Sequence, residues 1–196
     1  MVKKPRIDIN MEKLAINNVL KLEKLSSELE HEQATSLYLR LRKHEGENIS
    51  YIKIRKHLRE LIEKFEQDFW SDSSNISDKQ VKESDLAETL VQAENEFNYK
   101  RKEIIKKKLR DSGINQTDLS KILGHSKGYM SELINGLRPF SKEDIVIINR
   151  LLKINLDYLV PTFIKQEKAS HIKRTLKTIS NSKIKLTKND FDFQLA

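Results

Sequence analysis

The stretch from Asn115 to Gly136 constrains the fold of this chain more than any other part of it. Asn115 is suited to cap a helix that begins at Gln116, and Ser126 is suited to cap a second helix, because these side chains accept hydrogen bonds from free backbone N–H groups. Gly124 between them allows the left-handed turn that two packed helices need. The stretch therefore predicts two short helices, over 116–123 and 127–135, that cross at a tight turn.

Each of these predicted helices has one apolar face. The apolar positions are Leu119, Ile122 and Leu123 in the first helix and Met130, Leu133 and Ile134 in the second. Gly136 ends the second helix, and Ser141 then caps a third helix with Asp144 at the capping-box position. Asn155 is suited to cap a last short helix. We therefore expect a compact run of short helices that ends near residues 160–161.

The rest of the chain also has helical periodicity. Apolar residues recur at helical spacing over 22–42, 50–69 and 84–109, and 5 Gly and 3 Pro among 196 residues leave few turn-forming positions. Ser77 and Gln80 have the spacing of a capping box, and Gly113 is placed like the glycine that follows a helix. We therefore predict an all-α protein in which one or two helices join an N-terminal helical segment to the run of short helices.

We divide the sequence into four regions. Residues 1–13 are expected to be a flexible arm, 14–98 a helical partner-binding or scaffold region, 99–161 the domain of short helices, and 162–196 a basic tail in which Lys183 to Leu186 alternates like a short strand. Residues 1–98 hold 16 Lys and Arg against 19 Asp and Glu, a net charge of −3, whereas residues 99–196 hold 21 against 10, a net charge of +11. This asymmetry favours nucleic-acid binding by the second half, although lysine-rich solvated surfaces are the ordinary alternative.

Several classes of function find no support in the sequence. The absence of Cys excludes disulfides, Cys-ligated zinc and a thiol nucleophile. No apolar run has the length of a membrane span, and the N-terminus lacks the apolar region of a secretory signal, so we expect a cytoplasmic protein. The five His have no metal-ligand spacing, and Ser50 with Lys53 matches a nucleophile pattern that lacks any partner motif. We therefore expect neither a cofactor nor a metal, and we do not expect an enzyme.

Residues from about 101 to 160 resemble the Cro/C1-type (XRE family) DNA-binding domain, a five-helix, lambda-repressor-like fold. The residues that carry the resemblance, in order, are Gln116, Leu119, Ser120, Leu123, Gly124, Ser126, Tyr129, Met130, Ser131, Asn135, Gly136 and Arg138. The resemblance implies a helix-turn-helix that binds duplex DNA, with 127–135 as the recognition helix in the major groove. The alternative is a small helical bundle that only resembles the motif.

The resemblance also implies which residues contact DNA. They are Gln116, Thr117, Ser126, Lys127, Gly128, Tyr129, Ser131, Glu132, Asn135 and Arg138. In the family's pattern Gln116 contacts a phosphate, and so do Ser131, Asn135 and Arg138, whereas Lys127, Gly128, Tyr129 and Glu132 face base edges. Lys127 stands where amides are common in the family and Ile134 replaces a frequently polar residue, so the base preference does not transfer. Tyr129 either faces the bases or packs against the helix start, and His125 is either a solvated turn residue or a phosphate contact.

The layout of the whole chain resembles HigA-type antitoxins of type II toxin–antitoxin systems, more loosely in the first half. The runs that carry this resemblance are Lys82 to Glu88, Tyr129 to Leu133 and Val146 to Leu152. It implies a homodimer that represses its own operon from a palindromic operator and binds a small basic ribonuclease toxin. Dimerisation is expected through Leu156, Tyr158, Leu159 and Phe163. The alternative is a stand-alone XRE-type repressor of phage or mobile-element type whose N-terminal helices only dimerise or sense another partner.

Overall fold

The computed structural model describes residues 14–43, 49–72, 74, 76–161 and 166–179. The chain divides into two compact units, Met1–Leu159 and Val160–Ala196. Within the described ranges all regular structure is helical, in agreement with the all-α prediction. The helices of the first unit are η1 (Val19–Lys21), α1 (Glu28–Lys43), α2 (Ile49–Trp70), α3 (Asp78–Asp111), α4 (Gln116–Ile122), α5 (Lys127–Ile134), α6 (Lys142–Leu152) and η3 (Leu156–Tyr158).

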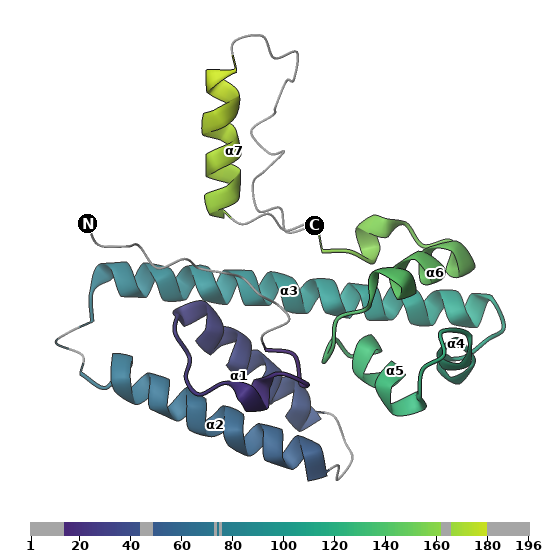
Figure 1. Ribbon diagram of the computed structural model, residues 1–196, viewed down its shortest axis with the longest axis horizontal. Coiled ribbons are helices and arrows are strands. Elements are labelled where there is room, and N and C mark those ends of the chain that lie inside the picture. The colour runs from purple at the N-terminus through teal and green to yellow at the C-terminus, as the bar shows by residue number, and fades with distance from the viewer. Residues whose placement is uncertain (1–13, 44–48, 73, 75, 162–165, 180–196) are drawn as a thin grey trace. The chain divides into compact units, whose positions relative to one another are not determined.

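Helix α3 runs through the whole first unit (Figure 1). Its 34 residues are continuous, and at 1.5 Å per residue they extend over about 50 Å. Helices α1 and α2 lie beside one part of α3, and α4 and α5 lie on the same side of it further along (Figure 1). The predicted connection between the two halves of the chain is therefore one uninterrupted helix.

The start of α3 forms only half of the capping box that the sequence predicted. Ser77 Oγ accepts a hydrogen bond from the backbone N–H of Gln80 at 3.2 Å, as expected. The Gln80 side chain, however, donates to the backbone carbonyl of Phe69 at 2.8 Å instead of binding back to Ser77. The Gln80 amide therefore ties the end of α2 to the start of α3.

The N-terminal part of the unit is a bundle of η1, α1, α2 and the first half of α3, called the N-terminal bundle below. Its core contains Leu14, Ile16, Val19, Leu25, Ala34, Leu37, Leu41, Ile54, Leu58, Leu61 and Phe65, with one residue from outside the bundle, Leu137. A smaller cluster of Leu29, Ala87 and Val91 joins α1 to α3. Of the apolar stripe predicted over 50–69, Ile54, Leu58, Leu61 and Phe65 are buried, Ile62 is partly buried and Phe69 is half exposed.

The first long helix begins later than predicted, at Glu28 instead of near Leu22. Ser27 Oγ accepts a hydrogen bond from the N–H of Glu30 at 3.2 Å, and the Glu30 carboxylate accepts one from the N–H of Ser26 at 2.8 Å. These two hydrogen bonds satisfy backbone N–H groups that would otherwise lie free, so they fix the helix start. Leu22 and Leu25 still pack on the core from a non-helical segment, which explains why their spacing was misleading.

The second part of the unit comprises the end of α3 with α4, α5, α6 and η3. These elements enclose a core of Ile105, Leu109, Leu119, Met130, Leu133, Ile134, Phe140, Ile148, Leu152, Ile154 and Leu159. The predicted bounds of the two helices at the turn are correct to within one residue. The last expected helix is the short 3₁₀ turn η3, which Asn155 caps by accepting from the N–H of Asp157.

The second compact unit contains α7 (Gln166–Thr178), a helix in the region predicted as a basic tail. Three predictions from the sequence lie outside the described residues. They are the arm over 1–13, the strand-like run at Lys183 to Leu186 and the role of Phe163.

Candidate nucleic-acid interface

The two helices of the motif are held by the caps that the sequence predicted. Asn115 Oδ1 accepts from the N–H groups of Thr117 and Asp118, and the Asp118 carboxylate accepts from the N–H of Asn115, so α4 begins with a complete capping box. Ser126 Oγ accepts from the N–H of Tyr129 at the start of α5. Gly124 has φ +70°, a left-handed conformation that favours glycine. These local interactions fix the angle at which α5 leaves the turn.

The first turn of α5 is open to solvent. Lys127, Gly128 and Tyr129 are exposed, and so is the capping residue Ser126. The opposite face is buried, since Met130, Leu133 and Ile134 lie in the core. At the start of α4, Gln116 and Thr117 are partly buried. A helix that exposes both the partial positive charge of its N-terminus and a lysine suits contact with an anionic groove.

The Tyr129 ring has one aromatic neighbour, His125, and one cationic neighbour, Arg138, while 38% of the residue remains exposed. Its centroid is 4.9 Å from that of His125, and the Arg138 guanidinium carbon lies 5.3 Å from its centroid. His125 itself is not a freely solvated turn residue, because its Nε2 lies 2.9 Å from the buried Asp144 carboxylate on α6. The neighbouring ring and the cation hold Tyr129 at the surface in one orientation.

Glu132 is mostly buried, unlike a side chain that is open to contact DNA bases. One carboxylate oxygen accepts a hydrogen bond from Tyr51 Oη of α2 at 2.8 Å, and the other accepts from Arg138 Nε. The Glu132 side chain is only 13% exposed. Burial, and then this hydrogen bond, raise the pKa of Tyr51 to about 12. Both oxygens of Glu132 are thus engaged within the protein, and Glu132 links the N-terminal bundle to Arg138.

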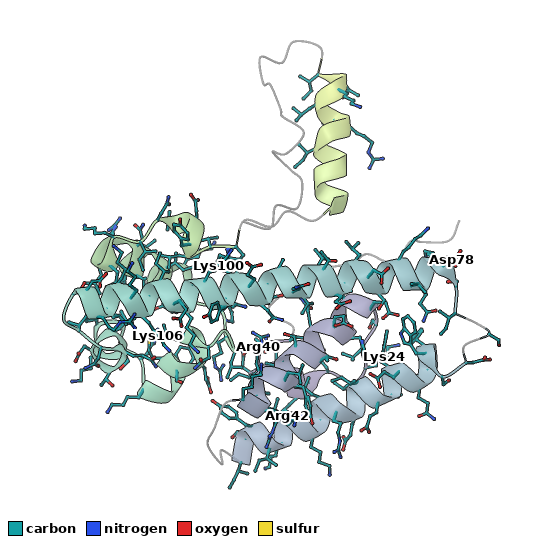
Figure 2. The ribbon with its side chains drawn as sticks, turned by 180° about the vertical axis from the view of Figure 1, so that it is seen from behind. Lys24, Arg40, Arg42, Asp78, Lys100 and Lys106 are labelled. Carbon is teal, nitrogen blue, oxygen red and sulfur yellow. The ribbon has the colours of Figure 1, made fainter. Side chains whose placement is uncertain are left out.

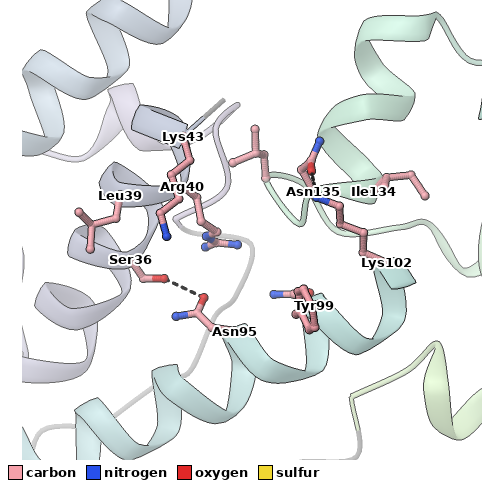
Figure 3. A pocket seen from close by; sticks show the side chains of 11 residues that line it. Ser36, Leu39, Arg40, Lys43, Asn95, Tyr99, Lys102, Ile134 and Asn135 are labelled. Atoms are coloured by element: carbon pink, nitrogen blue, oxygen red, sulfur yellow. Dashed lines mark hydrogen bonds between the residues drawn. The ribbon is translucent and has the colours of Figure 1, made fainter. Parts of the chain in front are cut away.

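Two further cations hold the C-terminal end of α5, one from the second half of α3 and one from the bundle. Lys102 Nζ of α3 donates to Asn135 Oδ1 at 2.8 Å, and the Asn135 amide donates to the Ser131 carbonyl at 2.9 Å. Arg40 of α1 donates through Nη1 to the carbonyl of Gly136. Figure 3 shows these side chains around a common pocket. Sequence patterns did not point to Arg40, Tyr51 or Lys102 here, because each partner is 33 to 96 residues away.

Residues 105–159 match the family model described as Helix-turn-helix. Over this range the chain therefore contains a helix-turn-helix domain of the XRE type. The matched range covers the end of α3 through η3, the elements that share the second core. Comparisons with curated proteins and with solved structures gave no match. In the described part of the chain, each helix is too short or too polar to cross a membrane.

The helix-turn-helix domain presents part of the expected dimerisation patch. Leu156 and Tyr158 of η3 are about half exposed. Leu159 is only 1% exposed and belongs to the core of the domain, so it does not lie on the surface with them. On α6, Ile147 and Leu151 are also exposed, and a separation of four residues places them on one helix face. Sequence periodicity did not separate these exposed apolar residues from the buried ones.

Proposed function

We propose that this protein is a sequence-specific transcriptional regulator that acts in the cytoplasm by placing α5 in the major groove of its operator. The observation that carries the proposal is the exposed first turn of a capped, solvent-facing α5 within a domain of DNA-binding type. Lys127, Gly128 and Tyr129 approach the base edges, with Lys127 donating to guanine. The phosphate contacts come from Gln116, Thr117, Ser126, Ser131, Asn135 and Arg138.

Selection from a pool of random duplexes tests this proposal and identifies the operator sequence at the same time. Immobilised protein is expected to enrich one short motif over successive rounds, because base contacts in the major groove discriminate by about 1–3 kcal/mol each. Lys24→Gln provides the control, since it removes a distant positive charge, and it should enrich the same motif. A pool that stays random after repeated rounds would sink the proposal of sequence-specific binding.

The proposed regulator is a homodimer that reads a palindrome. Leu156 and Tyr158 form the apolar part of the contact, with Ile147 and Leu151 of α6 adding to it. Two recognition helices placed about 34–36 Å apart contact successive major grooves. Light scattering measures the mass in solution and on operator DNA, and a monomer in both conditions contradicts this part of the proposal.

A finer proposal is that the protein is the antitoxin of a HigBA-like pair and neutralises a small basic ribonuclease toxin. An acidic groove supports this proposal, and it lies where α1 and α3 begin and α2 ends. This groove of about 700 Å³ is lined by Glu28, His31, Glu63, Glu66, Gln67, Trp70, Ser71 and Ser84. Three carboxylates beside Trp70 suit a basic protein surface that also buries apolar area.

Co-expression with the product of an adjacent short reading frame for a basic protein tests the antitoxin proposal. Tagged regulator should retain that product, and Glu63→Lys should release it. Glu60→Lys is the matched control, because Glu60 and Glu63 both lie on α2 and each pairs with a cation four residues before it. Equal retention by both variants places the partner elsewhere, and no retention by the unmodified protein favours the stand-alone repressor whose bundle dimerises or senses another partner.

A further inference from the structure

A pocket of about 430 Å³ lies where the N-terminal bundle meets the end of the recognition helix. Figure 3 shows it between α1, α3 and the residues that follow α5. The residues that line it are Ser36, Leu39, Arg40, Lys43, Asn95, Asn98, Tyr99, Lys102, Ile134, Asn135 and Leu137. Its volume falls within the range of about 300–1,000 Å³ that small-molecule sites in proteins occupy.

The lining has the chemistry of an anion site. It contains three cations, Arg40, Lys43 and Lys102, together with three side-chain amides and two hydroxyl groups, and none of these described lining residues is a carboxylate. Guanidinium, ammonium and amide N–H groups are the donors that proteins use to bind phosphate oxygens. Tyr99, which is 65% exposed, offers an aromatic face at the rim, and Leu39 offers an apolar surface near it. This combination suits a ligand with one phosphate and one flat ring.

Arg40 carries unused donor capacity at this pocket. Its Nη1 donates to the Gly136 carbonyl, but its Nε is shielded from solvent and has no hydrogen-bond partner within the described residues. Burial lowers the pKa of Arg40, and the charge of Glu94 opposes that shift. A desolvated guanidinium is costly to the folded protein, and the negative charge of an anion bound in the pocket would offset part of that cost.

We propose that this pocket binds a small organic phosphate of nucleotide size, and that its binding weakens the binding of DNA. Lys43 and Lys102 supply ammonium groups to the phosphate, Arg40 adds the positive charge of its guanidinium, and Tyr99 stacks on the ring. Ligand binding stands on the pocket alone, whereas the effect on DNA rests on the function proposed above.

The coupling follows from two contacts that the pocket shares with the DNA-binding surface. Lys102 holds the side chain of Asn135, and Arg40 holds the carbonyl of Gly136. A phosphate between these cations competes for both donors and places negative charge beside the loop that contains Arg138. DNA phosphates near that loop are then repelled. Because coupling between two sites is reciprocal, DNA must weaken ligand binding by the same factor.

Thermal unfolding of the full chain without DNA tests the site itself, with adenosine monophosphate and inorganic phosphate as probes at constant ionic strength. Adenosine monophosphate should raise Tm more than inorganic phosphate, since only the nucleotide uses Tyr99. Lys43→Gln should weaken nucleotide binding about ten- to hundredfold, the effect of losing one charged hydrogen bond. Lys24→Gln removes the same charge away from Arg40, as Figure 2 shows, and should leave nucleotide binding unchanged.

Asn95→Asp is a second variant that keeps the fold. Ser36 Oγ donates to Asn95 Oδ1 at 2.9 Å, and a carboxylate accepts that bond equally well. The new negative charge should abolish the Tm rise with nucleotide without lowering Tm itself. An equal rise in Asn95→Asp and in the unmodified protein overturns the proposal, because the nucleotide then binds elsewhere.

Titration of selected duplex DNA tests the coupling. Saturating nucleotide should weaken DNA binding by about 5- to 150-fold, the usual range for coupled sites, and Asn95→Asp should not respond. If neither probe raises Tm, the proposal is wrong. If Lys43→Gln then also lowers the salt slope of DNA binding by about one, the pocket contacts the DNA backbone instead. If nucleotide binds as expected but no duplex does, the ligand site stands and the proposed function fails.

Discussion

Lys127 and Arg138 both bring positive charge to the recognition surface, but their surroundings give them different roles. Lys127 is exposed at the N-terminus of α5, where it is free to follow a base edge. Arg138 is held against Glu132 and the ring of Tyr129, which fixes the guanidinium that we propose contacts a phosphate. A mobile cation at a base and a fixed cation at a phosphate have different effects on specificity.

Alanine substitutions separate these two roles. Lys127→Ala should relax the preference at one base position at a cost of about 1–3 kcal/mol, whereas Arg138→Ala should weaken all duplexes alike and flatten the salt dependence. Titrations of operator and random duplexes over a range of salt concentrations measure both effects. Equal loss on both kinds of DNA for both variants contradicts the assignment.

Glu28 at the start of α1 gives the bundle a predictable response to pH. One of its oxygens accepts from Trp70 Nε1 at 3.1 Å, while the other is buried and has no hydrogen-bond partner in the described part of the chain. Burial raises the pKa of Glu28, and the charge of His31 and the Trp70 hydrogen bond oppose the shift only partly. The folded state therefore holds this proton more tightly than the unfolded state, and ionisation costs stability as pH rises from 4.5 through the raised pKa.

Replacement of this carboxylate by an amide should therefore stabilise the protein at neutral pH. Glu28→Gln is expected to raise Tm at pH 7, and the gain should shrink toward about pH 4, where the unmodified side chain is protonated in the folded state. Trp70, the only tryptophan, reports the transition by its fluorescence. Glu60→Gln makes the same charge change at an exposed site and should shift Tm little at either pH. A Glu28→Gln gain that does not depend on pH would mean that charge is not the cause.

At the level of elements, helix starts that depend on neighbouring residues were predictable. The caps at Asn115, Ser126 and Ser141 all form, because each involves backbone groups two or three residues away. The start of α1 was predicted wrongly, although Ser27 and Glu30 carry the capping-box spacing, because the leucines before them kept a helical period. The hydrogen bond from the Gln80 amide to Phe69 was not predictable from a local sequence pattern, because the two residues are 11 positions apart.

The turn between α4 and α5 allows a matched test on two glycines. Gly124 has φ +70°, and a Cβ there meets no atom within 4 Å, so Gly124→Ala should cost only the backbone strain of about 1–2 kcal/mol. Gly128 lies in the first turn of α5 with equal free space, and Gly128→Ala should instead stabilise the helix by up to about 1 kcal/mol. Urea unfolding of both variants measures the difference. A similar change in stability for the two variants would contradict the role of the turn.

The whole first unit depends on contacts between distant segments. Leu137 follows α5 in the chain but is 2% exposed within the core of the N-terminal bundle, and its carbonyl accepts from the N–H of Ile16. Arg101 is buried on α3 between the rings of Phe97 and Phe140, and burial lowers its pKa to about 10. The sequence identified the second core and its turn, but it contained no signal for the contact between the domain and the bundle, which brings together residues as far apart in the chain as Ile16 and Leu137.

This contact should make the two cores unfold together. Leu137→Ala is expected to cost about 2–5 kcal/mol, and it should lower the midpoints measured by Trp70 fluorescence and by far-UV circular dichroism equally. Leu86→Ala removes a leucine of α3 that is 44% exposed, and it should have little effect. Two separate transitions, with the fluorescence midpoint unchanged by Leu137→Ala, would show that the bundle and the domain are independent.

Sequence-specific DNA binding through the first turn of α5 is the central claim, and a fluorescence anisotropy titration tests it most directly. The duplex enriched by selection is compared with a shuffled duplex of the same composition, with the unmodified protein and with Lys127→Ala. We predict that the unmodified protein binds the enriched duplex more tightly than the shuffled one. We also expect affinity to fall linearly on a logarithmic scale with the logarithm of salt concentration, and Lys127→Ala to lose most of the preference. Equal affinity of the unmodified protein for both duplexes, or binding to neither, would contradict the claim.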